Sequence, residues 1–205
     1  MNDRPHPGGP HDRILATATR LFLEHGIQAV SIKRIIAEAG VAQMTLYRRF
    51  GGKDQLVVAV LEHWGAGWLR SLIDRVEGHG DDPATRLAGL WAAILEWQAT
   101  EGRHGSLILN AAIELRGEPD HPAQAVIEAH QLAVRQLLDH LARLAGADDP
   151  AALAAQLHIV LEGALTAAVV DRRLPRAASI GAVADGILEA HLGGTARDHR
   201  TPRAS

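Results

Sequence analysis

The spacing of apolar residues along the first quarter of the chain predicts three short helices in succession. In the segment DRILATATRLFLEHG, apolar side chains recur at intervals of three and four residues, and Gly26 ends the pattern. The segment SIKRIIAEAG repeats this spacing, with Ser31 as its N-cap and Gly40 as its C-terminal stop. A third segment, AQMTLYRRF, ends at a Gly-Gly pair. We expect Asp12 to cap the first helix. The predicted buried positions of the first two helices are Ile14, Leu15, Ala18, Leu21, Phe22, Ile32, Ile35, Ile36 and Ala39.

From Lys53 onward the same periodicity predicts longer helices, separated by Gly, Pro and Asp. A fourth helix begins at Lys53 and continues to about Val76. Five further helices are expected at 82–100, 105–115, 121–145, 149–171 and 177–192. The chain is therefore expected to be all-α, with about nine helices. Its composition agrees, because Ala and Leu dominate and both enter helices at little cost in free energy.

The composition also limits the cellular setting. Cysteine is absent, which excludes a disulfide scaffold and a cysteine-based zinc site and suits a reducing cytosol. The polar, Pro- and Gly-rich N-terminus lacks the apolar segment of a signal peptide, and no apolar run approaches the roughly 20 residues of a membrane span. We expect a cytoplasmic protein without a membrane contact, with disordered tails at 1–10 and 194–205.

Charge is distributed unevenly along the chain. Residues 1–70 contain nine Lys/Arg and six Asp/Glu, a net charge of +3, whereas residues 71–205 contain twelve and eighteen, a net charge of −6. Both lysines, Lys33 and Lys53, lie in the basic part. This asymmetry favours an N-terminal surface that faces nucleic acid and a separate acidic body.

Residues 31–50 have the layout of a helix-turn-helix, in which the second helix lies in the major groove of DNA. Val41 and Leu46 are expected to pack in the core, so that the other side chains of the second helix face outward. Gln can bond adenine, Thr and Met can contact a thymine methyl group, Tyr can bond a phosphate, and Arg can bond a phosphate or guanine. Lys53 begins the next helix, where free backbone N–H groups favour a phosphate. The expected DNA contacts are Ser31, Lys33, Gln43, Met44, Thr45, Tyr47, Arg48 and Lys53.

Two arginines near these positions have an alternative role. Arg34 and Arg49 can either contact DNA or form ion pairs inside their own domain, and the sequence favours neither. A helical hairpin with a solvated basic face is the corresponding alternative for the whole of 31–50.

Residues 12–56 resemble the DNA-binding domain of the tetracycline-repressor (TetR) family of bacterial regulators. The similarity rests on ILATATRLFLEHG, SIKRIIAEAGV and TLYRRFGGKDQL, whose residues fall in one register. The resemblance implies a DNA-binding domain at 11–56 and a helical effector-binding and dimerisation domain at 57–193. It also implies contacts to DNA from Ser31, Thr45, Tyr47 and Lys53. The chain departs from the family at Ala42, where Ser or Thr is common, and at Gln43 and Met44, where Lys and a small residue are common.

Several residues beyond the first domain are candidates for effector binding. Tryptophans on the fourth and fifth helices can line an apolar pocket, although ordinary core packing is the more common role for any one of them. An asparagine in SLILNAAIEL either bonds the backbone or orients a ligand, and the backbone bond is favoured. His158 and Glu162 can form a pocket wall or metal ligands, but an intrahelical pair or a polar seam at a dimer interface is favoured. The candidate ligand-binding residues are Trp64, Trp68, Trp91, Trp97, Asn110, His158 and Glu162. The twelve histidines lack metal-binding spacing, so we expect no metal and no cofactor.

These features together predict a ligand-responsive transcriptional regulator. We expect a repressor that a small apolar or amphipathic effector releases from a near-palindromic operator. Two subunits would pair through the helices at 149–171 and 177–192 and place their third helices in successive major grooves. The alternatives are an activator and an effector-independent DNA-binding protein of the same fold. An enzyme using His158 and Glu162 would lack a nucleophile and a cofactor loop, so we expect no enzymatic activity.

Overall fold

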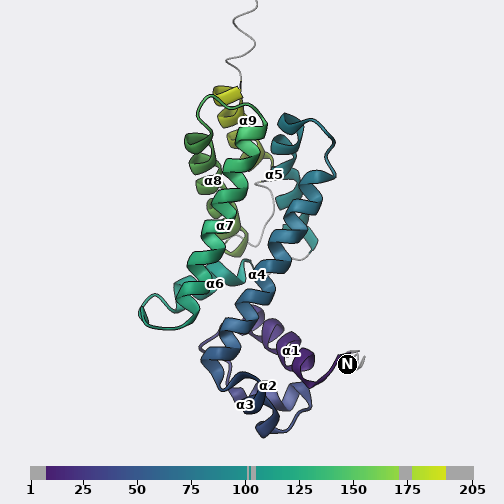
Figure 1. Cartoon of the computed structure of the whole chain (residues 1–205), viewed down its shortest axis with the longest axis vertical. Helices are drawn as coiled ribbons and strands as arrows, with labels where there is room; N and C mark the ends of the chain where they lie inside the picture. The colour runs from purple at the N-terminus through teal and green to yellow at the C-terminus, as the bar shows by residue number, and fades with distance from the viewer. Residues whose placement is uncertain (1–7, 101, 103–104, 171–176, 193–205) are drawn as a thin grey trace, which may run out of the picture. The chain divides into compact units, whose positions relative to one another are not determined.

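The computed structural model describes residues 8–100, 102, 105–170 and 177–192, and all the regular secondary structure within them is helical (Figure 1). The helices are α1 (Pro10–His25), α2 (Ile32–Ala39), α3 (Gln43–Phe50), α4 (Lys53–Glu77), α5 (Pro83–Thr100), α6 (Leu107–Glu114), α7 (Ala123–Leu144), α8 (Pro150–Val170) and α9 (Ala177–Leu192). The all-α prediction is confirmed. The predicted ends of the helices agree closely with these bounds, because Gly, Pro and capping residues mark most of them.

The chain divides into two compact units. Unit 1 consists of residues 1–68 and 106–130, and unit 2 consists of residues 69–105 and 131–205. The segment expected to bind DNA, residues 11–56, lies within unit 1. That unit also includes α6 and the beginning of α7, which the sequence alone had grouped with the C-terminal helices.

The start of α1 differs from the sequence-based prediction. Gly9 is the N-cap and Pro10 is the first helical residue, so Asp12 lies inside the first turn and does not cap the helix. Proline is favoured at this position because its fixed φ suits the helix and its missing N–H would have no partner there. Of the tails predicted to be disordered, residues 1–7 and 194–205 lie outside the described residues, whereas Pro10 is helical.

The core of unit 1 joins the first four helices, α6 and the start of α7. The apolar positions predicted for α1 are all buried, as are Ile35 and Ala39 of α2, while Ile32 and Ile36 are partly buried. The helices α1, α2 and α3 pack against one another (Figure 1). The core is completed by Ile27, Val30, Leu46, Phe50, Leu56, Val57, Val60, Leu61, Leu107, Ile108, Ala111, Leu115, Ala123 and Ile127. Burial of these side chains removes apolar surface from water and fixes the orientation of α3.

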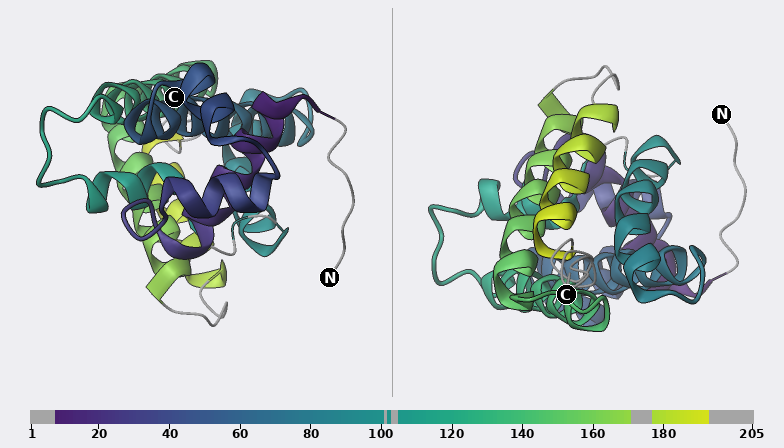
Figure 2. Two further views of the ribbon diagram at one scale, coloured as in Figure 1. Left: turned by 90° about the horizontal axis from the view of Figure 1, so that it is seen from below. Right: turned by 90° about the horizontal axis from the view of Figure 1, so that it is seen from above.

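Unit 2 is built around contacts of α9 with α5 and α8. The two views in Figure 2 show α8 and α9 side by side. The side-chain amide of the buried Gln98 donates a hydrogen bond of 3.0 Å to the Ala164 carbonyl, which joins α5 to α8. Among the described helices, the segment Pro150–Ala167 of α8 is by length and composition apolar enough to cross a membrane, and 33% of it is buried. Core helices of soluble proteins also meet this criterion.

Candidate nucleic-acid interface

The geometry of the turn between α2 and α3 follows from three residues. Ser31 caps α2, since its Oγ accepts a hydrogen bond of 3.3 Å from the backbone N–H of Arg34. Gly40 ends α2 in the left-handed region, with φ 62° and ψ 43°, which glycine adopts without a steric penalty. α3 begins directly after Ala42, which provides no side-chain hydrogen bond to the helix. The predicted cap at Ser31 and the predicted stop at Gly40 are both confirmed.

The exposed face of α3 carries the side chains expected to contact DNA. Leu46 is fully buried and Phe50 is 7% exposed, so these two residues fix one face of the helix against the core. Met44, at 75% exposure, and Tyr47, at 41%, lie outside that core. Gln43, Arg48 and Arg49 are exposed as well, and Thr45 is half-buried. A buried methionine or tyrosine would contribute to packing, whereas these two side chains are exposed to solvent.

The remaining predicted DNA contacts begin the helices on either side of α3. Ser31 and Lys33 are exposed at the start of α2, and Lys53 is half-buried at the start of α4. The Ser31 hydroxyl accepts the capping bond and retains a proton that it can donate to a phosphate. The amine of Lys53 donates a long hydrogen bond, 3.4 Å, to the carbonyl of Gln28.

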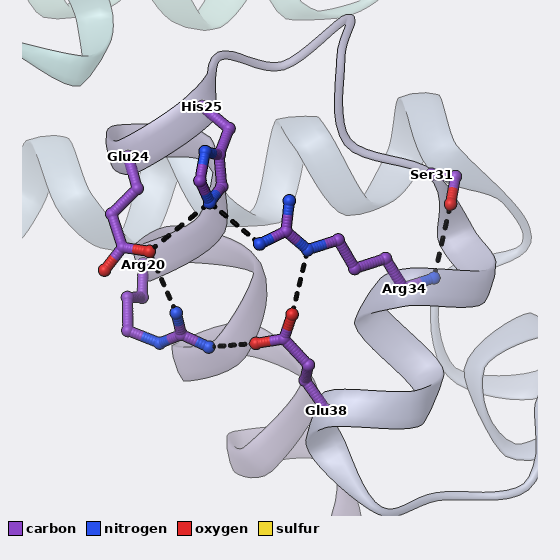
Figure 3. Close-up of polar contacts among 6 residues, drawn as sticks. All are labelled: Arg20, Glu24, His25, Ser31, Arg34 and Glu38. Atoms are coloured by element: carbon purple, nitrogen blue, oxygen red, sulfur yellow. Dashed lines mark hydrogen bonds and ion pairs between the residues drawn. The ribbon is translucent and has the colours of Figure 1, made fainter. Parts of the chain in front are cut away.

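Five charged or titratable side chains connect α1 and α2 in a closed ring (Figure 3). Arg20 donates hydrogen bonds to the carboxylates of Glu24 and Glu38. Arg34 donates to Glu38 at 2.9 Å and is bonded to His25 at 2.8 Å, while His25 lies 3.6 Å from Glu24. The Arg34 and Arg20 guanidinium groups hold the pKa of the Glu38 carboxyl below its ordinary value. The sequence left the role of Arg34 open, and the structure places it in this ring.

The ring engages Arg34, whereas other basic side chains near α3 lie outside it. Residues 31–53 contain five Lys/Arg and one Asp/Glu, and the single acid, Glu38, is bonded to Arg34. In the part of the chain that the structure describes, Lys33, Arg48 and Arg49 form no ion pair. This segment therefore presents a surplus of uncompensated positive charge around α3, as a phosphate-binding surface requires.

A second polar connection joins the turn after α1 to the end of α6. The Glu114 carboxylate accepts hydrogen bonds from the backbone N–H groups of Ile27, at 3.0 Å, and Gln28, at 2.9 Å. The Gln28 side chain donates to the Glu114 carbonyl and to the Glu118 carboxylate, both at 3.1 Å. Sequence reasoning did not find this connection. The only local signal was Gly26, whose positive φ of 85° indicates a special turn but not its distant partner.

Comparisons with known proteins agree with this geometry. The model for the family described as bacterial regulatory proteins, tetR family, matches residues 14–60. A crystal structure of a TetR-family transcriptional regulator from Streptomyces coelicolor is 28% identical, with a TM-score of 0.82 over 89% of this chain and 96% of that chain. The chain belongs to the TetR family. Members of this family are transcriptional regulators and not enzymes.

Relatives of known sequence match about half of this TetR-family chain or most of it. The transcriptional repressor KstR2 of Mycolicibacterium smegmatis is 29% identical over 103 residues, 50% of this chain and 49% of that protein. The transcriptional repressor Rv3405c of Mycobacterium tuberculosis is 39% identical over 101 residues, 49% of this chain and 45% of that protein. An uncharacterized regulator of Mycobacterium bovis is 26% identical over 188 residues, 90% of this chain and 89% of that protein. The chain thus matches about half the length of the first two relatives.

The effector candidates of this TetR-family chain fall into two groups. Trp64, Trp68 and Asn110 belong to unit 1, where the two tryptophan rings stack with centroids 6.4 Å apart. Trp68 is also 5.6 Å from the ring of His130, and burial lowers the pKa of that histidine to about 4. Trp68 is 7% exposed, while Trp64 and Asn110 are partly buried.

The other four candidates lie in unit 2. Trp91 and Trp97 are buried on α5, and the Nε1 atom of Trp91 has no hydrogen-bond partner among the described residues. His158 and Glu162 lie one turn apart on α8 with their side-chain atoms 3.7 Å apart. Gln131 of α7 joins them, since it donates to Glu162 at 3.2 Å and is bonded to His158 at 3.0 Å. Burial is the main cause that lowers the pKa of His158, and the nearby Glu162 opposes it.

Proposed function

We propose that this TetR-family protein is a sequence-specific, DNA-binding transcriptional repressor that acts in the cytoplasm. The observation that carries the proposal is the exposed face of α3, on which Gln43, Met44, Tyr47 and Arg48 project from a helix fixed by the buried Leu46. An α-helix of this kind fits the major groove. Two similar proteins, KstR2 and Rv3405c, are transcriptional repressors, which supports repression as the direction of regulation.

Each exposed side chain has a role that its chemistry supports. Gln43 would bond an adenine edge, and Met44 with Thr45 would contact thymine methyl groups. The phosphate contacts would come from Ser31, Lys33, Tyr47, Arg48 and Lys53. Lys53 lies at the start of α4, where the helix dipole and free N–H groups add to its positive charge.

A homodimer formed through α8 and α9 is the second part of the proposal. Ile159 of α8 is 70% exposed and Val183 of α9 is 54% exposed, although these two helices pack against each other. The exposed positions of both helices are mostly small or apolar: Ala151, Ala155, Ile159, Gly163, Val170, Ala182, Val183, Gly186 and Ala190. A second copy of this surface would remove it from water and pair the two α3 helices for half-sites about one turn of DNA apart.

The third part of the proposal is an effector that binds unit 2 beside α5 and α8. Support comes from Trp91, whose buried indole N–H lacks a partner within the described residues. A buried donor without an acceptor costs about 1–3 kcal/mol, which a ligand acceptor atom would offset. Trp97, His158 and Glu162 provide apolar and polar groups in the same unit. The expected effector is an apolar or amphipathic molecule with a hydrogen-bond acceptor, and it would act by favouring the conformation that binds DNA less tightly.

Selection of bound duplexes from a random DNA pool, at two salt concentrations, tests the proposal. The expected result is an enriched palindrome with half-sites about one helical turn apart and an affinity that falls steeply with salt. The enriched duplex then serves as the probe for a screen of small molecules that release it. A Trp91→Phe variant should retain DNA binding and lose sensitivity to an effector that bonds the indole. Absence of both enrichment and salt-sensitive binding would reject the regulator.

A further inference from the structure

We propose that Glu114 is a positioning residue for DNA binding: through Gln28 it sets the place of the Lys53 amine, which contacts a DNA phosphate. The inference rests on the proposed function, because the phosphate contact of Lys53 is part of it. It assigns to α6, a helix outside the helix-turn-helix, an influence on the strength of DNA binding.

The first step is the pair of hydrogen bonds from the turn after α1 to Glu114. Its two carboxylate oxygens each accept one backbone N–H, from Ile27 at 3.0 Å and from Gln28 at 2.9 Å. Hydrogen bonds to an ionised acceptor are stronger than neutral ones, and two parallel bonds fix orientation as well as distance. The turn is therefore held in one position by a side chain 86 residues further along the chain.

Gly26 allows the carboxylate to approach this turn. A Cβ atom at position 26 would lie 2.9 Å from Glu114 Oε1, and the backbone there has φ 85°. Both conditions favour glycine over any other residue. The absence of a side chain at Gly26 thus lets the turn lie directly against the Glu114 carboxylate.

The second step is the fixation of Gln28 itself. Its backbone N–H donates to Glu114, and its side-chain amide donates to the Glu114 carbonyl and to Glu118. Because three bonds restrain this exposed residue, its carbonyl oxygen has a set direction. That oxygen accepts the hydrogen bond from the Lys53 amine at 3.4 Å.

The third step connects this restraint to DNA affinity. A lysine side chain loses much conformational freedom when its amine is immobilised on a phosphate. The bond to Gln28 restrains that amine before DNA arrives and uses one of its three donors, so two remain for a phosphate oxygen. The bond from Lys53 to the Gln28 carbonyl is long and therefore weak. It can orient the amine without preventing the amine from binding a phosphate.

Glu114→Gln and Glu128→Gln make a matched pair of variants, because both remove one negative charge from unit 1. Glu128 is exposed on α7 and takes part in no described interaction, so its loss should leave DNA affinity unchanged or slightly tighter. If Glu114 acts only as a charge, its loss should do the same. If Glu114 instead positions Lys53, Glu114→Gln should change DNA affinity in the opposite direction. Binding should become about fivefold weaker, which is the effect expected for the loss of one exposed charge contact.

The probe is a mixed-sequence DNA duplex at low salt, since phosphate contacts do not depend on sequence. Affinity is measured for the full chain at several salt concentrations, together with the melting temperature of each variant. Lys53→Ala should weaken binding and make the salt dependence of affinity less steep. Glu114→Gln should change the affinity and its salt dependence in the same directions. The double variant should bind no more weakly than Lys53→Ala alone, because both changes act on one contact.

The possible results separate the inference from the function on which it rests. If Glu114→Gln lowers the melting temperature but leaves the affinity and salt slope of the folded protein unchanged, Glu114 is structural and the inference is wrong. If the two variants lose affinity additively, Glu114 does not act through Lys53, and the inference is again wrong. If Lys53→Ala has no effect, the phosphate contact of Lys53 fails, and the inference fails with it. If the unaltered chain does not bind the duplex, the proposed function itself is rejected.

Discussion

Arg34 donates a hydrogen bond from its Nε atom to the Glu38 carboxylate one turn later in α2, at a distance of 2.9 Å. The same guanidinium is bonded to His25 of α1, so the side chain connects two helices of unit 1 (Figure 3). Arg34 follows Lys33 directly, near the start of α2. A basic residue at this position would by itself suggest a DNA contact. The bonds of Arg34 indicate a structural role instead.

The first prediction compares Arg34 with Arg48, which is exposed on α3 and forms no ion pair within the described residues. Arg48→Ala should weaken binding to a duplex and reduce its salt dependence by about one ion. Arg34→Ala should change DNA affinity by about twofold at most and leave the salt slope unchanged, while lowering the melting temperature. Fluorescence anisotropy at several salt concentrations measures both effects. Equal losses of affinity would place Arg34 on DNA.

The second prediction separates base contacts from phosphate contacts on α3. Gln43→Ala should lower discrimination at one base pair by about 1–3 kcal/mol, because a bidentate bond to adenine is lost. Tyr47→Phe removes only the hydroxyl and should weaken binding to all duplexes to a similar degree. Repeating the duplex selection with each variant shows whether one position of the enriched site becomes degenerate. A change of preference in the Tyr47 variant would contradict these roles.

The third prediction concerns two glycines of α4 that are two residues apart. A Cβ atom at Gly65 would lie 2.9 Å from Nδ1 of His130, whereas a Cβ atom at Gly67 would have no such neighbour within 4 Å. Gly67→Ala should therefore stabilise the protein by about 0.5–1 kcal/mol through higher helix propensity. Gly65→Ala should destabilise it by about 1 kcal/mol or more, because overpacking outweighs that gain. Denaturant unfolding of both variants measures the difference, and a gain in both would show that His130 moves aside freely.

The fourth prediction is a pH dependence of stability that arises at His130. Burial lowers the pKa of this histidine from 6.5 to about 4. Between these values the unfolded chain binds a proton that the folded chain does not, so stability falls as the pH falls through this window. The loss is on the order of 3 kcal/mol, and it is complete below pH 4.

Variants at two histidines of α7 test that assignment. His130→Gln should flatten the decline of unfolding free energy between pH 6.5 and 4, whereas His140→Gln, at an exposed position, should leave it unchanged. His158 contributes a smaller decline in the same direction, since its pKa is lowered as well. Tryptophan fluorescence is a suitable probe, because Trp68 lies next to the His130 ring. An unchanged profile in His130→Gln would show that this imidazole is protonated in the folded protein.

The fifth prediction tests the proposed dimer surface. Ile159→Glu should convert the dimer to a monomer, because two charges would face each other in an apolar interface. Ile113→Glu introduces the same charge at a comparably exposed apolar position of α6 and should leave the assembly unchanged. Sedimentation velocity gives the mass of each variant in solution. A dimer that tolerates Ile159→Glu would place the interface elsewhere.

Local sequence signals determined most of the secondary structure of this protein. Ser31 and Gly40 mark the ends of α2 because a hydroxyl cap and a left-handed glycine are preferences of single residues, which act in any tertiary context. The buried positions of α1 follow from helical periodicity for the same reason. The exposed face of α3 could be predicted because Leu46 was expected in the core, which leaves the opposite side of the helix outward. Asp12 was misassigned because Pro10 offered a competing start for the helix.

Only the tertiary structure decided the contacts between distant segments. The bonds from Gln28 to Glu114 cross 86 residues, and no periodicity or cap records them. The role of Arg34 depended on whether Glu38 and His25 would lie within reach, which helix packing alone determines. The division into units falls inside α4 and α7, where the pattern of helical residues continues without a break. Sequence patterns carry backbone preferences over a few residues, whereas these features depend on which side chains the fold brings together.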